Sequence, residues 1–182
     1  MKIIQGKYKG RVLKGFDIDG TRPTMDRVKE SLFAMIQNKV PNSKCLDLFS
    51  GSGNLGIEAL SMGANDVVFV DKNRISIKTI NENLSNINEN RRVLNNDYKD
   101  AILKLSTTDK FDIIFLDPPY KSNYVLNSIE NIIEFNILEN DGIIVVETDD
   151  KNKIEEIKKY NNLEVYDIRK YGIVLVIFIR KG

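Results

Sequence analysis

Three glycines and one aspartate have a spacing that could support ligand binding. Gly51, Gly53 and Gly56 match the pattern Gly-x-Gly-x-x-Gly, and Asp71 follows Gly51 by 20 residues. A glycine turn between a strand and a helix lets a nucleotide approach the helix N-terminus, and an acid at this distance is typical of ribose binding. The spacing indicates a nucleotide-type cofactor, although a tight turn without a ligand would use the same glycines.

Asp47 bears on which cofactor this is. It precedes Gly51 by four residues, so we expect its carboxylate close to the glycine loop. The pyrophosphate of NAD would meet a negative charge there, whereas a cationic ligand would be attracted. S-adenosylmethionine carries a ribose, an ammonium and a sulfonium and no phosphate. Asp47 therefore favours S-adenosylmethionine, with NAD as the alternative.

A second motif, Asp117-Pro118-Pro119-Tyr120, follows a run of six apolar or strand-type residues. The two prolines lack N–H donors and stiffen the backbone, which leaves carbonyl oxygens and the Asp117 carboxylate as acceptors. Such acceptors suit an exocyclic –NH2 group, while the Tyr120 ring stacks on a flat heterocycle. The motif predicts Asp117, Pro118 and Tyr120 as catalytic residues. The alternative is a proline turn with Tyr120 as a surface anchor.

The composition excludes several kinds of chemistry. The 182 residues contain no histidine and a single cysteine, Cys45, so imidazole catalysis, histidine-ligated zinc, a cysteine metal cage and an internal disulfide are excluded. We therefore expect no metal. No apolar run approaches the ~20 residues of a membrane span, and the N-terminus lacks an apolar secretory segment. These features predict a cytoplasmic protein without membrane contact.

The elements that position these motifs alternate along the chain. Strands are expected at 45–49, 67–70, 93–94, 111–116, 143–147, 163–168 and 173–179, and helices at 25–38, 54–63, 74–87, 99–105, 125–135 and 151–160. Solidly apolar strands alternating with helices indicate a parallel sheet covered on both faces. The fold class is α/β: a doubly wound, Rossmann-like, seven-stranded, mainly parallel sheet with a C-terminal antiparallel hairpin and a small N-terminal β-hairpin/helix extension. We divide the chain into this extension, residues 1–40, and one compact unit, residues 41–182.

In such sheets the ligand lies beyond the carboxyl ends of the strands. Asp47, the glycine loop, Asp71, Asp97 and the 117–120 motif all follow strands. They are therefore predicted to gather at one edge of the sheet.

The net charge of +1 is unevenly distributed. Residues 1–30 hold eight basic and four acidic side chains, a net charge of +4. Four of the basic side chains, Lys7, Lys9, Arg11 and Lys14, lie in the expected hairpin, where they could hold RNA phosphates. A solubilising role is the alternative.

The motifs together resemble a known family. Residues 47–53 and 117–120 are similar to class I S-adenosylmethionine-dependent methyltransferases that modify exocyclic amines of nucleic-acid bases. Residues 3–6, 10–11 and 22–33 narrow this resemblance to the RsmD family, and it extends from about residue 2 to 180. The resemblance implies methyl transfer to N2 of one guanine in 16S ribosomal RNA. Methylation of DNA or of another RNA at adenine N6, and an NAD oxidoreductase, are the alternatives.

The resemblance also implies roles for individual residues. Asp47, Gly51 and Gly53 would hold the methionine end of the cofactor, Asp71 the ribose hydroxyls, and Asp97 the adenine amine. The remaining cofactor residues would be Thr24, Phe49, Lys72 and Tyr98, and further RNA contacts would come from Arg22 and Arg27. Asp97 could instead only cap a helix. The expected partner is 16S RNA in an assembling or assembled small subunit, bound by a monomer.

Overall fold

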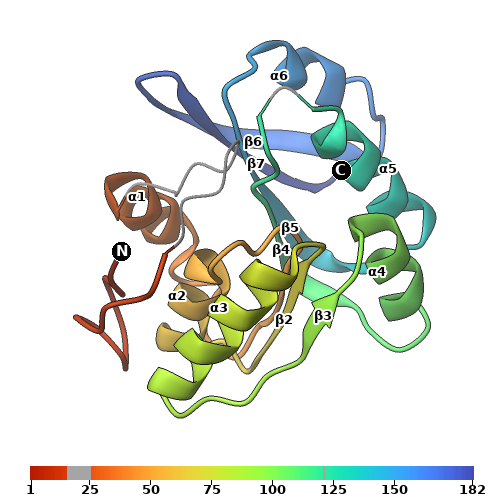
Figure 1. Ribbon diagram of the computed structural model, residues 1–182. Coiled ribbons are helices and arrows are strands. Elements are labelled where there is room, and N and C mark those ends of the chain that lie inside the picture. Colours follow the sequence, from red (N-terminus) through yellow and green to blue (C-terminus); the bar gives the residue numbers. More distant parts are fainter. Residues whose placement is uncertain (16–25, 121) are drawn as a thin grey trace.

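A single mixed sheet forms the centre of the molecule. The computed structural model describes residues 1–15, 26–120 and 122–182. Within these residues the sheet has seven strands in the order β3-β2-β1-β4-β5-β7-β6 (Figure 1). The strands are β1 (Lys44–Asp47), β2 (Asp66–Asp71), β3 (Val93–Asn95), β4 (Phe111–Leu116), β5 (Leu138–Thr148), β6 (Leu163–Tyr171) and β7 (Val174–Lys181). The first five pair in parallel and β7 is antiparallel to both neighbours, which confirms the predicted fold class.

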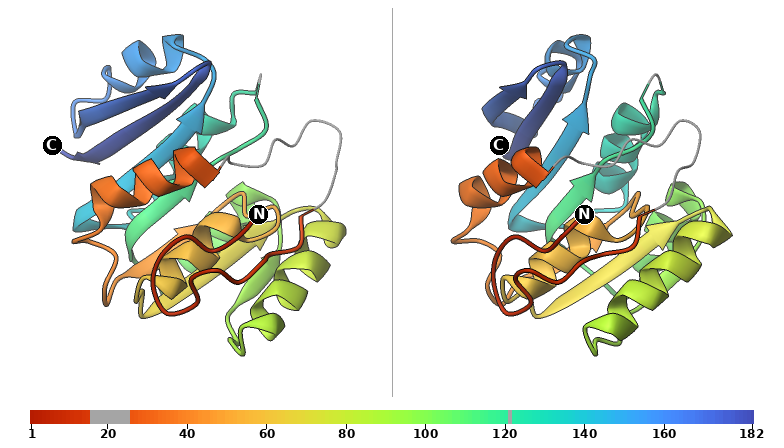
Figure 2. Two further views of the ribbon diagram at one scale, coloured as in Figure 1. Left: turned by 90° about the vertical axis from the view of Figure 1, so that its left-hand side faces the viewer. Right: turned by 60° about the vertical axis from the view of Figure 1, so that its left-hand side comes forward.

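Helices cover both faces of the sheet. Within the described residues they are α1 (Asp26–Ile36), α2 (Asn54–Ser61), α3 (Arg74–Asn86), α4 (Tyr98–Leu105), α5 (Tyr124–Glu134) and α6 (Asn152–Ile157). Two apolar clusters lie on opposite faces of the sheet: residues 1–15 and α1–α3 contribute to one, and α4–α6 to the other (Figure 2). Strands with side chains buried on both faces explain why the sequence shows solid apolar runs rather than alternation.

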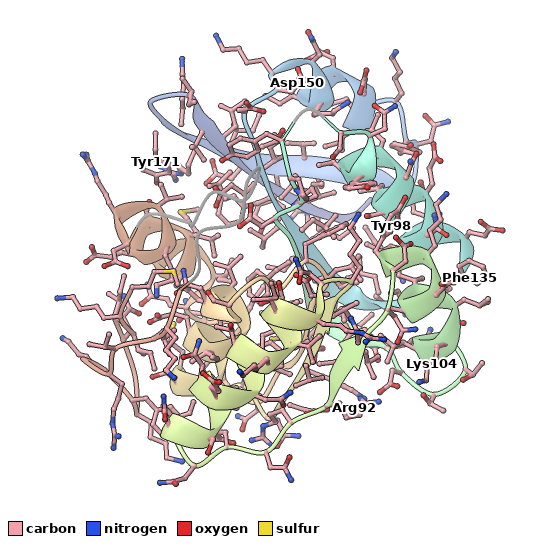
Figure 3. The ribbon with its side chains drawn as sticks, in the orientation of Figure 1. Arg92, Tyr98, Lys104, Phe135, Asp150 and Tyr171 are labelled. Atoms are coloured by element: carbon pink, nitrogen blue, oxygen red, sulfur yellow. The ribbon has the colours of Figure 1, made fainter. Side chains whose placement is uncertain are left out.

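The C-terminal strands form the expected hairpin. Tyr171 pairs with Val174, so Gly172 and Ile173 make the turn, and Gly172 has φ +62°. Positive φ is the conformation that glycine adopts without a steric cost. The hydroxyl of Tyr171 contacts Ser31 of α1, and Figure 3 shows Tyr171 beside that helix. The turn therefore packs against the N-terminal part of the chain.

The N-terminal segment differs in detail from the expected β-hairpin. Residues 1–15, which we call the N-terminal arm, contain an isolated antiparallel bridge between Lys2 and Val12 and are otherwise turns and irregular backbone. Its backbone hydrogen bonds run partly across the arm itself, as from the Ile3 amide to the Arg11 carbonyl at 2.9 Å, and partly to side chains on α2 and α3. Ile3 and Leu13 are buried in the same cluster as α1 and the sheet. The division at residue 40 stays a prediction.

In the described ranges, every helix is too short or too polar to span a membrane.

Candidate functional site

The two motifs lie on neighbouring strands. β1 and β4 are paired in parallel, with Asp47 opposite Phe115. The glycine loop follows β1, and Asp117 comes directly after β4. The strand order reverses direction between these two strands, which is where ligands bind in open α/β sheets. The loop and the 117–120 motif are thus brought to one edge, as the sequence predicted.

The backbone of the glycine loop is held tightly. Gly51 and Gly53 have φ of +54° and +85°, and Gly53 is the N-cap of α2. The Gly53 amide donates to the Ser50 carbonyl at 2.7 Å, and the Ser50 hydroxyl donates to the Asp47 carbonyl at 2.6 Å. Because both glycines use left-handed backbone, side chains at these positions would strain the turn. The loop thus turns directly into the N-terminus of α2.

Asp47 lies beneath the loop. The residue is 2% exposed, and its Oδ2 atom accepts a hydrogen bond from the Gly56 amide at 2.9 Å. Burial raises the pKa of Asp47 to about 7, although the Gly56 hydrogen bond opposes that shift. A nearby cation would stabilise the ionised form, and an added phosphate would not. The observed partner of the Asp47 side chain is the first turn of α2.

Asp71 joins the loop to the end of β2. Its Oδ2 accepts from the Gly51 amide at 2.9 Å, and its Oδ1 accepts from the Asn73 amide at 2.8 Å. Burial raises the pKa of this half-buried carboxyl. A carboxylate has about four acceptor positions, so both oxygens retain capacity for ligand hydroxyls.

An aromatic cluster gathers three of the predicted cofactor residues. The rings of Phe49 and Tyr98 lie 5.5 Å apart, and Tyr124 packs against Phe49 at 5.9 Å and against Tyr98 at 5.4 Å. The Nζ atom of Lys72 lies 5.4 Å from the Tyr124 ring centroid. Figure 3 shows Tyr98 at the start of α4. The cluster connects the loop after β1 with the starts of α4 and α5, and it offers apolar faces suited to a flat ring.

Asp97 is the N-cap of α4. Its Oδ1 atom accepts from the Lys99 amide at 3.0 Å. This hydrogen bond satisfies a backbone donor at the helix start, so the capping role is sufficient to account for the residue type. Its predicted contact with an adenine amine stays a prediction.

The 117–120 motif is anchored to β5. The Tyr120 hydroxyl donates to Oε1 of Glu147 at 3.0 Å, and Glu147 is 3% exposed. Asp117 and Tyr120 are half-buried and Pro118 is buried. A buried carboxylate that accepts this bond fixes the position of the Tyr120 side chain at the sheet edge.

These residues fit S-adenosylmethionine by the chemistry of their donors and acceptors. Asp47 and Asp71 are carboxylates, the left-handed glycines let a ligand approach the backbone closely, and the aromatic cluster supplies a stacking surface. Two carboxylates next to the loop suit a ligand with hydroxyls and positive charge better than a pyrophosphate.

Comparison with known proteins agrees with this donor set. The family model described as Conserved hypothetical protein 95 matches residues 1–180. Ribosomal RNA small subunit methyltransferase D of Haemophilus influenzae is 37% identical over 152 residues, which cover 82% of this chain and 79% of that protein. The chain belongs to the RsmD family.

Two further relatives match this RsmD family member over its whole length. The Bacillus subtilis protein YlbH is 39% identical over 184 residues, covering 100% of this chain and 99% of YlbH. The solved structure of Escherichia coli yhhF has a TM-score of 0.86 and 28% identity, covering 100% of this chain and 98% of that one. The chain is an S-adenosylmethionine-dependent methyltransferase, so the predicted cofactor is confirmed and the NAD oxidoreductase alternative is wrong.

The basic residues predicted to contact RNA are divided between the arm and α1 in this RsmD family member. Lys7, Lys9, Arg11 and Lys14 are exposed on the arm, and Arg27 is exposed on α1. Arg22 and the predicted cofactor residue Thr24 lie outside the described residues.

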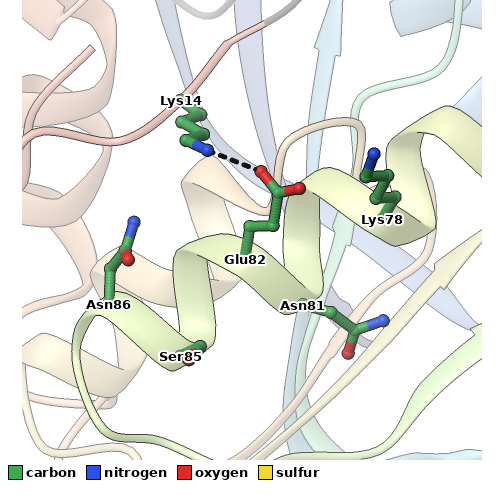
Figure 4. Close-up of a pocket in the computed structure, with 6 residues that line it drawn as sticks. All are labelled: Lys14, Lys78, Asn81, Glu82, Ser85 and Asn86. Carbon is green, nitrogen blue, oxygen red and sulfur yellow. Dashed lines mark hydrogen bonds and ion pairs between the residues drawn. The ribbon is translucent and has the colours of Figure 1, made fainter.

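Two of the arm cations meet acidic side chains. Lys14 forms an ion pair with Glu82 at 2.7 Å, and Lys7 lies 4.0 Å from Glu89. An open polar groove runs between the arm and α3, lined by Lys14, Lys78, Asn81, Glu82, Ser85 and Asn86 (Figure 4). Of the predicted site residues, this groove contains Lys14. It is separate from the loop and from the 117–120 motif.

Sequence reasoning missed residues that the fold places at the site. Tyr124 and Glu147 complete the aromatic cluster and the Tyr120 anchor. Glu147 directly follows the apolar run 143–146 of β5, and a charged residue beside a buried run is a signal that could have drawn attention. Tyr124 carries no comparable signal, because nothing local distinguishes it from a tyrosine on a helix surface.

Proposed function

We propose that this chain methylates the exocyclic N2 amine of a guanine in 16S ribosomal RNA. The observation that carries the proposal is the pairing of β1 with β4, which sets the glycine loop beside Asp117-Pro118-Pro119-Tyr120. Its RsmD relative in Haemophilus influenzae is named as a methyltransferase of small-subunit ribosomal RNA. The donors and acceptors of the motif match an amine on a flat base.

The proposed roles follow from hydrogen bonding. The Asp117 carboxylate and the Pro118 carbonyl accept hydrogen bonds from the N2 protons, which orients the nitrogen lone pair towards the methyl group. Tyr120, held by Glu147, stacks on the base after it leaves its loop. The amine proton leaves after transfer, to Asp117 or to water. No strong general base is needed, which agrees with a chain that lacks histidine.

The cofactor residues have complementary proposed roles. S-adenosylmethionine, when bound, supplies an electrophilic methyl group. Gly51 and Gly53 form the left-handed turn whose backbone holds its methionine end and Asp47 supplies negative charge there, while Asp71 accepts the ribose hydroxyls. The predicted adenine contact is Asp97, with Tyr98 beside it, and Phe49 and Lys72 complete the proposed cofactor residues.

The decisive experiment is methyl transfer to defined RNA. Small subunits from a strain that lacks this protein are incubated with the enzyme and tritiated S-adenosylmethionine, and the nucleosides are then separated. We expect label in N2-methylguanosine. Label in N6-methyladenosine, or transfer to duplex DNA with none to subunits, would contradict the proposal.

Substitution of Asp117 tests the catalytic assignment. Asp117→Ala should lower transfer at least 100-fold while calorimetry with S-adenosylhomocysteine shows a Kd within about threefold of the wild type, because the lost acceptor faces the base. Asp141→Ala changes an exposed aspartate near the start of β5 and serves as the matched control. Retained turnover in Asp117→Ala would remove Asp117 from the mechanism.

We also propose that the substrate is a ribonucleoprotein particle in the cytoplasm, bound by one copy of the enzyme. Residues 1–40 would form the RNA-contacting extension and residues 41–182 the catalytic unit. A net charge of +4 over residues 1–30 supports phosphate contacts but little sequence reading. Equal activity on deproteinised 16S RNA would overturn the particle requirement, and sedimentation of the complex would give its stoichiometry.

A further inference from the structure

The N-terminal arm is bound by a polar stripe on α2. Glu58 accepts backbone hydrogen bonds from Ile4 and Gln5 at 2.8–3.1 Å, and Ser61 accepts one from Tyr8 at 2.9 Å. A Cβ atom added to Gly6 would lie 1.9 Å from the Ser61 carbonyl oxygen. The arm backbone therefore lies directly on the helix that begins at the glycine loop.

Lys29 of α1 links the arm to that loop. Its Nζ atom donates to the Lys2 carbonyl and to Oδ1 of Asn54, each at 2.7 Å, and forms an ion pair with Glu58 at 2.9 Å. The Lys29 side chain is 0% exposed and that of Glu58 is 1% exposed. The three protons of the ammonium group thus have three partners, one of them on the residue that follows Gly53.

Asn83 of α3 makes a second link. Its Oδ1 accepts from the Lys14 amide at 2.8 Å, and its Nδ2 donates to the Lys14 carbonyl at 3.0 Å and to the Ser52 carbonyl at 2.9 Å. Asn83 is 0% exposed. Ser52 and Asn54 flank Gly53, so each side of the loop is bonded to a buried side chain that also bonds the arm.

The hydrogen bond between Lys29 and Asn54 is accompanied by a cost in folding stability. Asn54 is 6% exposed, and its Nδ2 atom has no hydrogen-bond partner within the described ranges. An unpaired buried donor costs about 1–3 kcal/mol. An apolar side chain at the start of α2 would avoid that cost but would lose the bond to Lys29.

We propose that Lys29 and Asn83 are positioning residues that couple cofactor binding at the loop to RNA binding by the arm. The RNA half of this inference rests on the proposed function. Movement or ordering of Ser52 and Asn54 on cofactor binding passes to Lys2 and Lys14 through side chains that have no room to rearrange independently. By linkage, RNA and cofactor then raise each other's affinity by the same factor.

The first test needs no RNA. Hydrogen exchange of the Ile4, Gln5 and Lys14 amides is measured with and without saturating S-adenosylhomocysteine. In the wild type we expect at least fivefold slowing at all three amides. Asn54→Ala leaves the Lys29–Glu58 pair intact but removes its bond to the loop. That variant should lose the slowing at Ile4 and Gln5 and keep it at Lys14.

The second test measures affinity for small subunits with and without S-adenosylhomocysteine. In the wild type, S-adenosylhomocysteine should raise the affinity for subunits at least fivefold. This ratio of the affinities with and without S-adenosylhomocysteine should fall below two in the double variant Asn54→Ala/Asn83→Ala. Ile132→Val trims a buried side chain on α5 and controls for lost stability; its ratio should match the wild type. A structural role alone would lower stability in all variants without changing the ratio selectively.

The outcomes separate the two proposals. A wild-type ratio of one, with subunits bound normally, would overturn the coupling and leave the methylation proposal standing. Slowed exchange at the arm without any binding of subunits would support the link between arm and loop but remove RNA as its partner. Equal slowing in wild type and Asn54→Ala would remove the Lys29 link.

Discussion

At the scale of single residues, the Asp47 carboxylate is buried beneath the glycine loop and accepts a hydrogen bond from α2. The sequence suggested a direct contact between Asp47 and a cationic ligand. In the structure its neighbour is the Gly56 amide, and the side chain is buried. A buried carboxylate keeps its proton to higher pH because burial penalises the charged form. Asp47 therefore holds the start of α2 through its hydrogen bond, and its protonation state depends on its burial.

The pH dependence of stability follows from this burial. The pKa of Asp47 is about 7 in the folded chain, above the 3.8 of an exposed aspartate. Its contribution to the free energy of unfolding is thus fully present below about pH 4 and is lost as pH rises through 7. Asp47→Asn lacks this loss, so between pH 5 and pH 8 the variant should gain about 2–3 kcal/mol relative to the wild type.

Urea denaturation of both proteins at the two pH values measures this change. A variant that keeps a constant difference from the wild type at pH 5 and pH 8 would show that Asp47 is ionised in the folded chain across this range.

At the scale of elements, the close approach of α2 to β2 depends on Gly56. An added Cβ at Gly56 would lie 2.3 Å from Cε1 of Phe69. The third glycine of the motif is therefore needed for packing between helix and strand, as the fingerprint predicts, and not for the turn. The same helix holds the arm through Glu58 and Ser61. Its position thus affects the loop and the arm together.

Gly56→Ala should lower the free energy of unfolding by about 1–3 kcal/mol. Helix propensity alone would change stability in the opposite direction, by about 1 kcal/mol, since alanine is favoured over glycine within helices. Denaturation of Gly56→Ala, Phe69→Leu and the double variant measures the contact. The two changes should be less destabilising together than their sum. Simple additivity would show that the ring does not meet the added methyl group.

At the scale of the whole molecule, the proposed catalytic site and the exposed cations of the arm lie on different parts of the surface. The sheet edge between β1 and β4 carries the proposed site, and the arm, whose cations are exposed, lies against α2 and α3 (Figure 2). The +1 net charge hides this arrangement. Lys29, counted as part of the basic N-terminal region, is buried in an ion pair and cannot contact RNA directly.

The salt dependence of RNA binding tests the arm surface. Each phosphate contact releases counterions, about 0.7–0.9 per contact, so the double variant Lys7→Ala/Lys9→Ala should reduce the slope of log K against log salt concentration by about 1.5. Lys104→Ala changes an exposed lysine on α4, on the other face of the sheet, and should leave the slope unchanged (Figure 3). Binding titrations with small subunits at four salt concentrations measure both slopes, and equal slopes for all three proteins would place the RNA elsewhere.

The sequence by itself determined the order of elements, the parallel sheet, the two motifs at strand ends and the class of cofactor. These properties follow from local patterns: apolar runs for buried strands, glycines where the backbone turns, and proline pairs that remove donors. Each of the seven expected sheet strands and each expected helix has a counterpart in the described chain, with ends shifted by up to five residues, whereas the expected N-terminal β-hairpin is reduced to one bridge.

Only the tertiary structure decided which polar residues are buried and what they contact. Lys29, Glu58 and Asn83 look like ordinary surface residues in the sequence, yet their partners lie 25–69 residues away along the chain. Tyr124 joins Phe49 and Tyr98 for the same reason: three separate chain segments meet at one sheet edge. Periodicity records which face of an element is apolar, but the pairing of one buried polar group with another is set by the packing of elements in space.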